Sequence, residues 1–287
     1  MLDKIVPLKI KYYFELIRFS KPTGFMLLMW PSWFALTLVP SNSINLIKWY
    51  IFFFIGAFLM RSAGCIINDL IDINIDKNIK RTANRSLATK KISIIEALIL
   101  LSFLLIISLI ILFQFNFFTI MIGLLSFPIL IIYPFMKRYT HWPQLILGIA
   151  FSWGVIIVSF QFYHTITFKH ALLYIGCIFW TLAYDTIYAY QDRKDDILNN
   201  VKSSAVLLGT KGKMYVKIFY LIFFLIIGYL GLKSSDNFYS LTVIIPMIFV
   251  MNYLLNKWDP ISIKKSNYYF KFNNVIGLYC FLFLLIF

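Results

Sequence analysis

The chain has 287 residues, of which 61% are hydrophobic and 14% are charged, and its mean hydropathy is +0.80. Because soluble domains carry about 25% charged residues, this composition indicates an integral membrane protein and excludes an ordinary soluble domain. The net charge is +15, but the basic residues cluster between apolar spans and do not follow one continuous face. We therefore expect the lipid bilayer as a partner and no nucleic acid.

Nine apolar segments have, or nearly have, the roughly 17–25 residues that a membrane-spanning helix needs. In chain order they lie at about 22–39, 49–67, 94–113, 117–135, 144–162, 171–189, 214–232, 239–255 and 270–287. They lack the short alternating pattern of a membrane β-barrel. The sequence thus predicts an all-α membrane protein, a nine-transmembrane-helix bundle in which residues 1–287 form a single integral-membrane domain.

The connections between these segments differ sharply in charge. The N-terminal segment and the connections after the second, fourth, sixth and eighth spans hold 21 basic residues, whereas the other connections hold three. Basic residues stay on the cytoplasmic side of a membrane protein, so we expect the N-terminus and these four connections in the cytoplasm. The two acidic stretches described next both fall on that side.

The first acidic stretch follows the second span and carries Asn68, Asp69, Asp72 and Asp76. On a helix, Asn68, Asp72 and Asp76 lie at i, i+4 and i+8, and Asp69 joins them at i+3 and i+7 spacings. Stacked carboxylates repel one another unless a cation lies among them. Oxygen ligands without a neighbouring His or Cys favour Mg²⁺ over zinc.

A second acidic stretch repeats this chemistry after the sixth span. Asp185, Asp192 and Asp196 are spaced i, i+7 and i+11, which again places them on one helical face. With the adjacent Asp195, seven of the 12 acidic residues of the chain lie in these two stretches. Solvated helix ends with scattered charge are the alternative, but the near absence of acids elsewhere favours two metal-binding helix ends.

Basic residues accompany both acidic stretches and would suit a diphosphate. They are Lys77, Lys80, Arg81, Arg85 and Lys194. Charge-assisted hydrogen bonds from such side chains bind phosphate oxygens, and Mg²⁺ on a diphosphate makes it a better leaving group.

Three further basic residues stand apart from the acidic stretches. Arg61 lies well inside the second apolar span, which makes it a candidate functional residue or, equally, a snorkelling or internally paired structural arginine. Lys137 and Arg138 end the fourth span and are the basic residues of a short loop.

The two acidic stretches and several sequence blocks around them resemble those of a known family. Asn68-Asp69-x-x-Asp72-x-x-x-Asp76 with the following KRTANRSLA resembles the first signature of the UbiA superfamily of intramembrane aromatic prenyltransferases, and YDTIYAYQDRKDD resembles the second. The chain is most similar to the bacterial 4-hydroxybenzoate polyprenyltransferases, through the blocks RFSKPTGFMLLMWP, RSAGCIIND, YPFMKRYTHWPQLILGIAFSWG and VKSSAVLLG. One departure is Arg85-Ser86, where that family usually has Arg-Pro.

The resemblance implies a nine-helix bundle around a central cavity with cytoplasmic capping loops, in a bacterial inner membrane. It implies Mg²⁺-dependent transfer of a polyprenyl group from polyprenyl diphosphate to the ring carbon ortho to the hydroxyl of 4-hydroxybenzoate, in ubiquinone biosynthesis. No obligate protein partner is evident.

The resemblance also implies roles for the residues singled out above. The metal and diphosphate would be held by Asn68, Asp69, Asp72, Asp76, Asp185, Asp192 and Asp196. The catalytic residues among them would be Asp72, Asp76, Asp185 and Asp192. Asp185 or the departing diphosphate would accept the ring proton.

The carboxylate of the aromatic acid needs a cation that the diphosphate has not taken. We favour Arg138 over Lys137, because arginine can bind a carboxylate through two parallel hydrogen bonds, and Arg61 is a third candidate. Positive residues at a helix end also serve simply as topology anchors. Two other functions stay open: a haem, chlorophyll or menaquinone type of UbiA prenyltransferase, and an ion-coupled transporter.

Overall fold

The computed structural model describes residues 7–40, 45–77, 81–235 and 238–287. Within these ranges the regular structure is entirely helical. The α-helices are α1 (Leu8–Leu16), α2 (Thr23–Thr37), α3 (Leu46–Ile71), α4 (Ile73–Asp76), α5 (Ile94–Leu112), α6 (Phe117–Tyr139), α7 (Pro143–Tyr163), α8 (Phe168–Ala189), α9 (Arg193–Leu198), α10 (Ser204–Leu208), α11 (Gly212–Ser235), α12 (Tyr239–Lys257) and α13 (Ile263–Ile286).

The long helices confirm the all-α membrane fold. Each of the nine predicted spans coincides with one long helix, namely α2, α3, α5, α6, α7, α8, α11, α12 or α13. Eight spans among the described residues are long and apolar enough to cross a membrane. The exception is α2, whose 15 residues are about 22 Å long, less than the roughly 30 Å of a hydrocarbon core. The predicted count of nine is therefore approximate.

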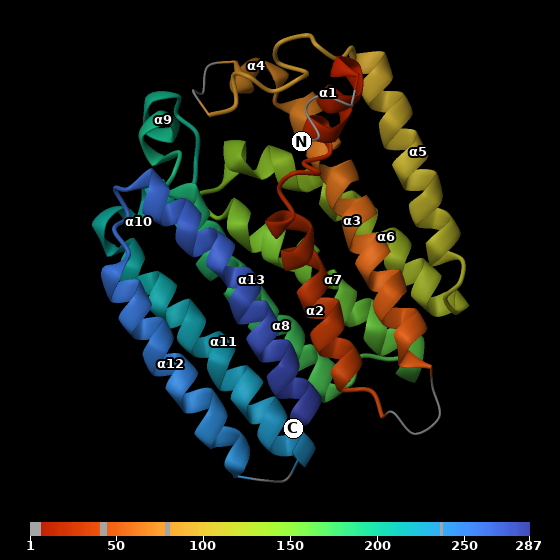
Figure 1. Cartoon of the computed structure of the whole chain (residues 1–287), viewed down its shortest axis with the longest axis vertical. Coiled ribbons are helices and arrows are strands. Elements are labelled where there is room, and N and C mark those ends of the chain that lie inside the picture. Colours follow the sequence, from red (N-terminus) through yellow and green to blue (C-terminus); the bar gives the residue numbers. More distant parts are fainter. Residues whose placement is uncertain (1–6, 41–44, 78–80, 236–237) are drawn as a thin grey trace.

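The helices form one bundle with a capped end (Figure 1). Neighbours in contact run α5, α3, α6, α7, α8, α11 and α12. α2 packs against α3 and α7, and α13 packs against α2 and α8. The short helices α1, α4 and α9 gather at one end of the bundle, at the top of Figure 1, and the C-terminus lies at the other. These short helices and their loops form the predicted cap.

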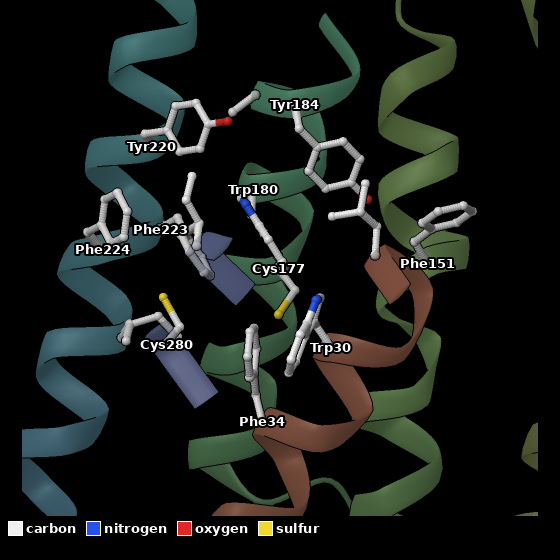
Figure 2. Close-up of a cluster of buried hydrophobic side chains, with 14 of the residues drawn as sticks. Trp30, Phe34, Phe151, Cys177, Trp180, Tyr184, Tyr220, Phe223, Phe224 and Cys280 are labelled. Atoms are coloured by element: carbon white, nitrogen blue, oxygen red, sulfur yellow. The ribbon is translucent and has the colours of Figure 1, made fainter. Parts of the chain in front are cut away.

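The largest hydrophobic core joins α2, α8, α11 and α13 (Figure 2). Trp180 of α8 stacks on Phe223 of α11, with ring centroids 5.1 Å apart and the planes 8° from parallel. The indole nitrogen of Trp180 and the hydroxyl of Tyr220 both donate to the Asn273 side-chain oxygen at 2.8 Å. Since leaving a buried donor unsatisfied costs about 1–3 kcal/mol, this network fixes the rotation of α8 and hence the direction of its acidic end.

A second core holds the loop after α4 against the bundle. Leu87 and Ile92 of that loop pack with Ile66 of α3. The sequence S-x-x-E then starts α5, where Ser93 accepts from the Glu96 amide and the Glu96 carboxylate accepts from the Ser93 amide. This packing returns the chain to the end of α3, where the first acidic stretch lies.

Candidate functional site

A cavity of about 1110 Å³ runs from the capped end into the bundle. It is lined along α3 from Asp72 back to Phe52, about 30 Å at 1.5 Å per residue. Its polar end is lined by six carboxylates and eight cationic side chains of the described residues. Toward Phe52 the lining is apolar, with residues such as Leu112, Phe115 and Trp153. The cavity can thus take a molecule with an anionic head and a long apolar tail.

The first acidic stretch forms one wall of the polar end. α3 ends at Ile71, but the Asp72 amide still donates to the Asn68 carbonyl at 3.0 Å and the Asp76 amide to the Asp72 carbonyl at 2.8 Å. The helical path therefore continues through α4 as the i, i+4, i+8 spacing predicted, with a break in the helix at Asp72. The side chains of Asn68, Asp69, Asp72 and Asp76 all line the cavity.

Arg18 and Arg85 form ion pairs with Asp69 and Asp76. Both of these carboxylates are nearly inaccessible to solvent. Arg18 Nη2 lies 2.8 Å from each carboxylate oxygen of Asp69. Arg85 Nη1 bridges the two acids, 2.9 Å from Asp69 Oδ1 and 2.7 Å from Asp76 Oδ2. The two carboxylates are therefore neutralised by side chains from separate segments of the cap.

Asp72 is 1% exposed and pairs with Lys137 through Oδ2, whereas Oδ1 has no hydrogen-bond partner. Burial raises the pKa of the Asp72 carboxyl, while the Lys137 ammonium acts in the opposite direction. A buried carboxylate oxygen without a partner is costly, so it marks a position where a cation can be received.

Arg81 connects the first loop to the second acidic stretch. Its Nε and Nη2 donate to the two oxygens of Asp192 at 2.7 and 2.6 Å, and Nη1 donates to the Tyr188 hydroxyl at 2.8 Å. The guanidinium also lies over the Tyr188 ring, 5.2 Å from its centroid. The structure therefore brings the two acidic stretches, more than 100 residues apart, to one end of one cavity.

The other acids of the second stretch are less compensated. Asp185, near the end of α8, and Asp196 of α9 both line the cavity. Asp196 is 7% exposed, and burial raises its pKa to about 6, with a hydrogen bond from Ser203 opposing the shift. Neither acid has a salt bridge among the described residues.

The carboxylates at the polar end of the cavity are candidate ligands for a divalent cation. No group of three acidic, His or Cys side chains among the described residues is already arranged around a metal position. The donor set nevertheless fits one, because carboxylate and amide oxygens line the same end of the cavity, no His is among the described lining residues, and Asp72 Oδ1 is unpartnered. Charge repulsion also couples Asp76 to Asp72 and Asp192 to Asp196, as expected of acids that share a site.

The predicted basic residues divide into two groups. Arg61, Arg81, Arg85 and Lys137 line the cavity. Lys77, Arg138 and Lys194 are exposed and lie outside the cavity lining, and Lys80 lies outside the described residues. The cation pair predicted at the end of the fourth span is thus split, with Lys137 turned to the cavity and Arg138 over the Phe135 ring.

Arg61 is embedded in the cavity wall. Its guanidinium lies 5.6 Å from the centre of the Phe151 ring, and its Nε has no hydrogen-bond partner. A Cβ at Gly24 would lie only 2.7 Å from this Nε, so glycine at that position leaves room for the guanidinium. Asp185 is within electrostatic range of Arg61.

Four cavity-lining cations were not predicted as site residues from the sequence, namely Arg18, Lys21, Lys202 and Lys271. Arg18 and Lys21 stand in the basic N-terminal segment and were counted only toward topology. Partial burial lowers the pKa of Lys21, and the neighbouring cations lower it further. The RFSKP block was the signal that could have assigned Arg18 and Lys21.

The family model of the UbiA prenyltransferase family matches residues 28–275. A 4-hydroxybenzoate octaprenyltransferase of Francisella tularensis subsp. mediasiatica is 37% identical over 276 residues, 96% of each chain. Among solved structures, an apo UbiA homologue of Aeropyrum pernix K1 has a TM-score of 0.73 at 21% identity, covering 92% of this chain and 97% of that one. A UbiA homologue of Archaeoglobus fulgidus bound to GPP and Mg²⁺ has a TM-score of 0.71 at 15% identity, covering 96% and 100%. The chain therefore belongs to the UbiA prenyltransferase family.

Proposed function

We propose that the chain transfers a polyprenyl group from polyprenyl diphosphate to the ring carbon ortho to the hydroxyl of 4-hydroxybenzoate, giving 3-polyprenyl-4-hydroxybenzoate for ubiquinone biosynthesis. The carrying observation is a single cavity that gathers both acidic stretches at one end and continues as an apolar channel. The Francisella relative, which is named for this activity, supports the choice of acceptor.

The polar end of the cavity supplies groups for the diphosphate and its metal. Asn68, Asp69, Asp72 and Asp76, with Asp185, Asp192 and Asp196, would hold Mg²⁺, which neutralises negative charge on the departing diphosphate. The Archaeoglobus homologue bound to GPP and Mg²⁺ supports this assignment. Arg81, Arg85 and Lys137 already point into the same space and bind the phosphate oxygens directly.

The walls below the polar end handle the reacting carbons. Tyr133 and Tyr188 line the cavity on opposite helices, α6 and α8, and their ring faces attract a carbocation. The apolar channel keeps water from that carbocation. Asp185, at the junction of polar and apolar lining, is the side chain that we assign to accept the ring proton.

Arg61 and Lys137 are the predicted carboxylate-binding residues that line the cavity, and Arg138 lies outside its lining. Lys137 already pairs with Asp72, whereas Arg61 Nε has no partner. We assign the carboxylate of 4-hydroxybenzoate to Arg61, since a buried guanidinium can bind it through two parallel bonds.

An assay of membranes containing the chain tests this function. Geranyl diphosphate radiolabelled in its prenyl group should give a labelled prenylated acid with 4-hydroxybenzoate and Mg²⁺, and excess chelator should abolish the product. Protohaem offered as acceptor in parallel should give none. Label transfer to protohaem instead, or undiminished activity with chelator, would overturn the proposed reaction or its metal dependence.

We place the capped end in the cytoplasm of a bacterial inner membrane, because 21 basic residues stand on that side against three on the other. All three native cysteines are buried, so single added cysteines report the orientation. Lys77→Cys and Lys194→Cys should react with an impermeant thiol reagent only from the cytoplasm, and Thr165→Cys only from outside. Labelling of the first two from opposite sides would overturn a shared site.

A further inference from the structure

Arg18 holds a position that neither its sequence context nor the reaction explains. It follows the last turn of α1 with φ of 58°, in the left-handed region that non-glycine residues enter at a cost of about 1–2 kcal/mol. Helices commonly place glycine at this point. The side chain instead reaches Asp69, 51 residues away, and also donates to the Glu15 carbonyl at 2.9 Å. The chain keeps an arginine here for what its guanidinium contacts.

The group that Arg18 contacts, the Asp69 carboxylate, accepts hydrogen bonds from two arginines. Asp69 already accepts from Arg85, which it shares with Asp76, and it accepts from Arg18 with both oxygens. Asp69 Oδ1 accepts two hydrogen bonds and Oδ2 accepts one, so few of the acceptor positions of this carboxylate are left for a metal. A divalent cation that binds Asp69 therefore competes with the two guanidiniums for its oxygens.

A displaced Arg18 remains beside positions suited to anions. Lys21, three residues on, also lines the cavity, and its ammonium has no hydrogen-bond or ion-pair partner among the described residues. Its pKa is lowered by partial burial and by the charges of Arg18, Arg81, Arg85 and Lys271, which are therefore close enough to repel its ammonium. Such a group of cations at the end of a cavity is favourable once a multiply charged anion lies among them.

We propose that Arg18 is a resident counter-ion that holds Asp69 until the metal binds, and then passes to the diphosphate. This inference rests on the proposed function, and it adds a positioning residue to it. In the unloaded chain Arg18 stabilises the buried carboxylate and fixes α1 on the end of α3. In the loaded chain the same guanidinium binds a phosphate oxygen next to Lys21.

The exchange predicts opposite changes in two binding affinities, which a purely structural ion pair would not produce. Removing Arg18 takes away a competitor of the metal and a partner of the diphosphate at the same time. In the purified full chain, Arg18→Gln should therefore bind Mn²⁺ alone more tightly, by about three- to tenfold in EPR titration. With Mn²⁺ saturating, it should bind geranyl diphosphate about tenfold more weakly in calorimetry, since the variant lacks one charge-assisted hydrogen bond to the phosphate.

Lys9→Gln is the matched control. Lys9 also ties α1 to a long helix, through Glu96 of α5, but it does not line the cavity. Its removal should leave both affinities unchanged. If Arg18→Gln does not fold, Arg18→Lys gives the same two measurements with smaller shifts of the same signs, because one ammonium cannot bind as a guanidinium does.

Opposite signs for the two affinities support the exchange. Loss of both affinities, or no change in either, assigns Arg18 to structure alone and overturns the inference while leaving the proposed function standing. If the unmodified chain bound neither Mn²⁺ nor geranyl diphosphate, the proposed function would fail, and this inference with it.

Discussion

The two acidic stretches look alike in sequence and differ in the structure. In the first, Asp69, Asp72 and Asp76 are each held by a basic side chain from another segment. In the second, Asp192 is held by Arg81, whereas Asp185 and Asp196 have no salt bridge among the described residues. Both stretches carry a D-x-x-x-D pair, so the difference arises from the cap and not from the motifs.

In the unloaded site, the carboxylates of the two stretches are therefore neutralised by basic side chains to different extents. Around the first stretch, incoming metal charge must replace existing counter-ions. Around the second stretch, it meets carboxylates whose burial is poorly compensated, and for Asp196 the raised pKa is the sign of that cost. The two stretches should therefore respond differently to mutation even if the reaction needs both.

The largest expected effect tests whether both stretches serve one reaction. Asp72→Ala and Asp185→Ala should each lower kcat by at least about 100-fold, since each removes a charged group facing the reacting diphosphate or ring. Asp195→Ala is the matched control, because Asp195 lies in the second stretch but does not line the cavity. Product formation in the same membrane assay measures all three. Full activity of either of the first two variants would break the shared site.

Arg81 is the physical link between the stretches, so its loss should be next in size. Arg81→Ala should lower kcat/KM for the prenyl diphosphate by about ten- to 100-fold, and Arg81→Lys should recover only part, because lysine cannot reproduce the paired contact to Asp192. Arg193 provides the control: it lies over Tyr190 as Arg81 lies over Tyr188, but outside the cavity lining. Equal losses at both arginines would indicate a general packing defect.

The sequence and the structure favour different arginines for binding the aromatic acceptor. The motif pattern favours Arg138 for the carboxylate of 4-hydroxybenzoate, while the cavity lining favours Arg61. Arg61→Gln should raise KM for 4-hydroxybenzoate about tenfold and change KM for the prenyl diphosphate much less. Arg138→Ala should leave both KM values near those of the parent chain. A selective rise for Arg138→Ala would restore the sequence-based assignment.

Much of this architecture was predictable, because apolar length and charge asymmetry are local signals. They located the long helices and placed both acidic stretches at one end. What they could not give was rotation and long-range pairing. Adjacent residues on a helix point about 100° apart, so only packing decides that Lys137 and not Arg138 faces the cavity. Arg18 lies 51 residues from Asp69, and no sequence spacing indicates that contact.

Apolar length also does not locate the residue at which a helix ends. The first apolar segment was predicted to continue to residue 39, but α2 ends at Thr37, and Leu38 and Val39 follow it as buried or half-buried loop residues. Apolar character records burial, and it does not record where backbone hydrogen bonds stop. Hydropathy overestimates the length of α2, and it underestimates that of α3, whose 26 residues extend beyond the predicted span at 49–67.

The smallest expected effect concerns Asp196 in the metal-free chain, and its sign follows from the direction of the shift. Because the folded pKa, about 6, is above the usual value of 3.8, the folded state keeps its proton in a range where the unfolded state has lost it. Stability should therefore fall as the pH rises from about 4 to about 6, by at most about 3 kcal/mol. Above that range the full cost of the buried charge persists.

Asp196→Asn removes that cost, so with chelator present the variant should unfold at a higher temperature than the parent chain at about pH 7.5, by a few degrees, and should show no gain at about pH 4. Asp192→Asn is the comparison within the same stretch. Asp192 forms a paired contact with Arg81, so its neutralisation should lower the unfolding temperature at about pH 7.5. Opposite signs at two acids four residues apart would establish the uneven balance of the site. A lower unfolding temperature for both variants would instead mean that Asp196 is as well compensated as Asp192.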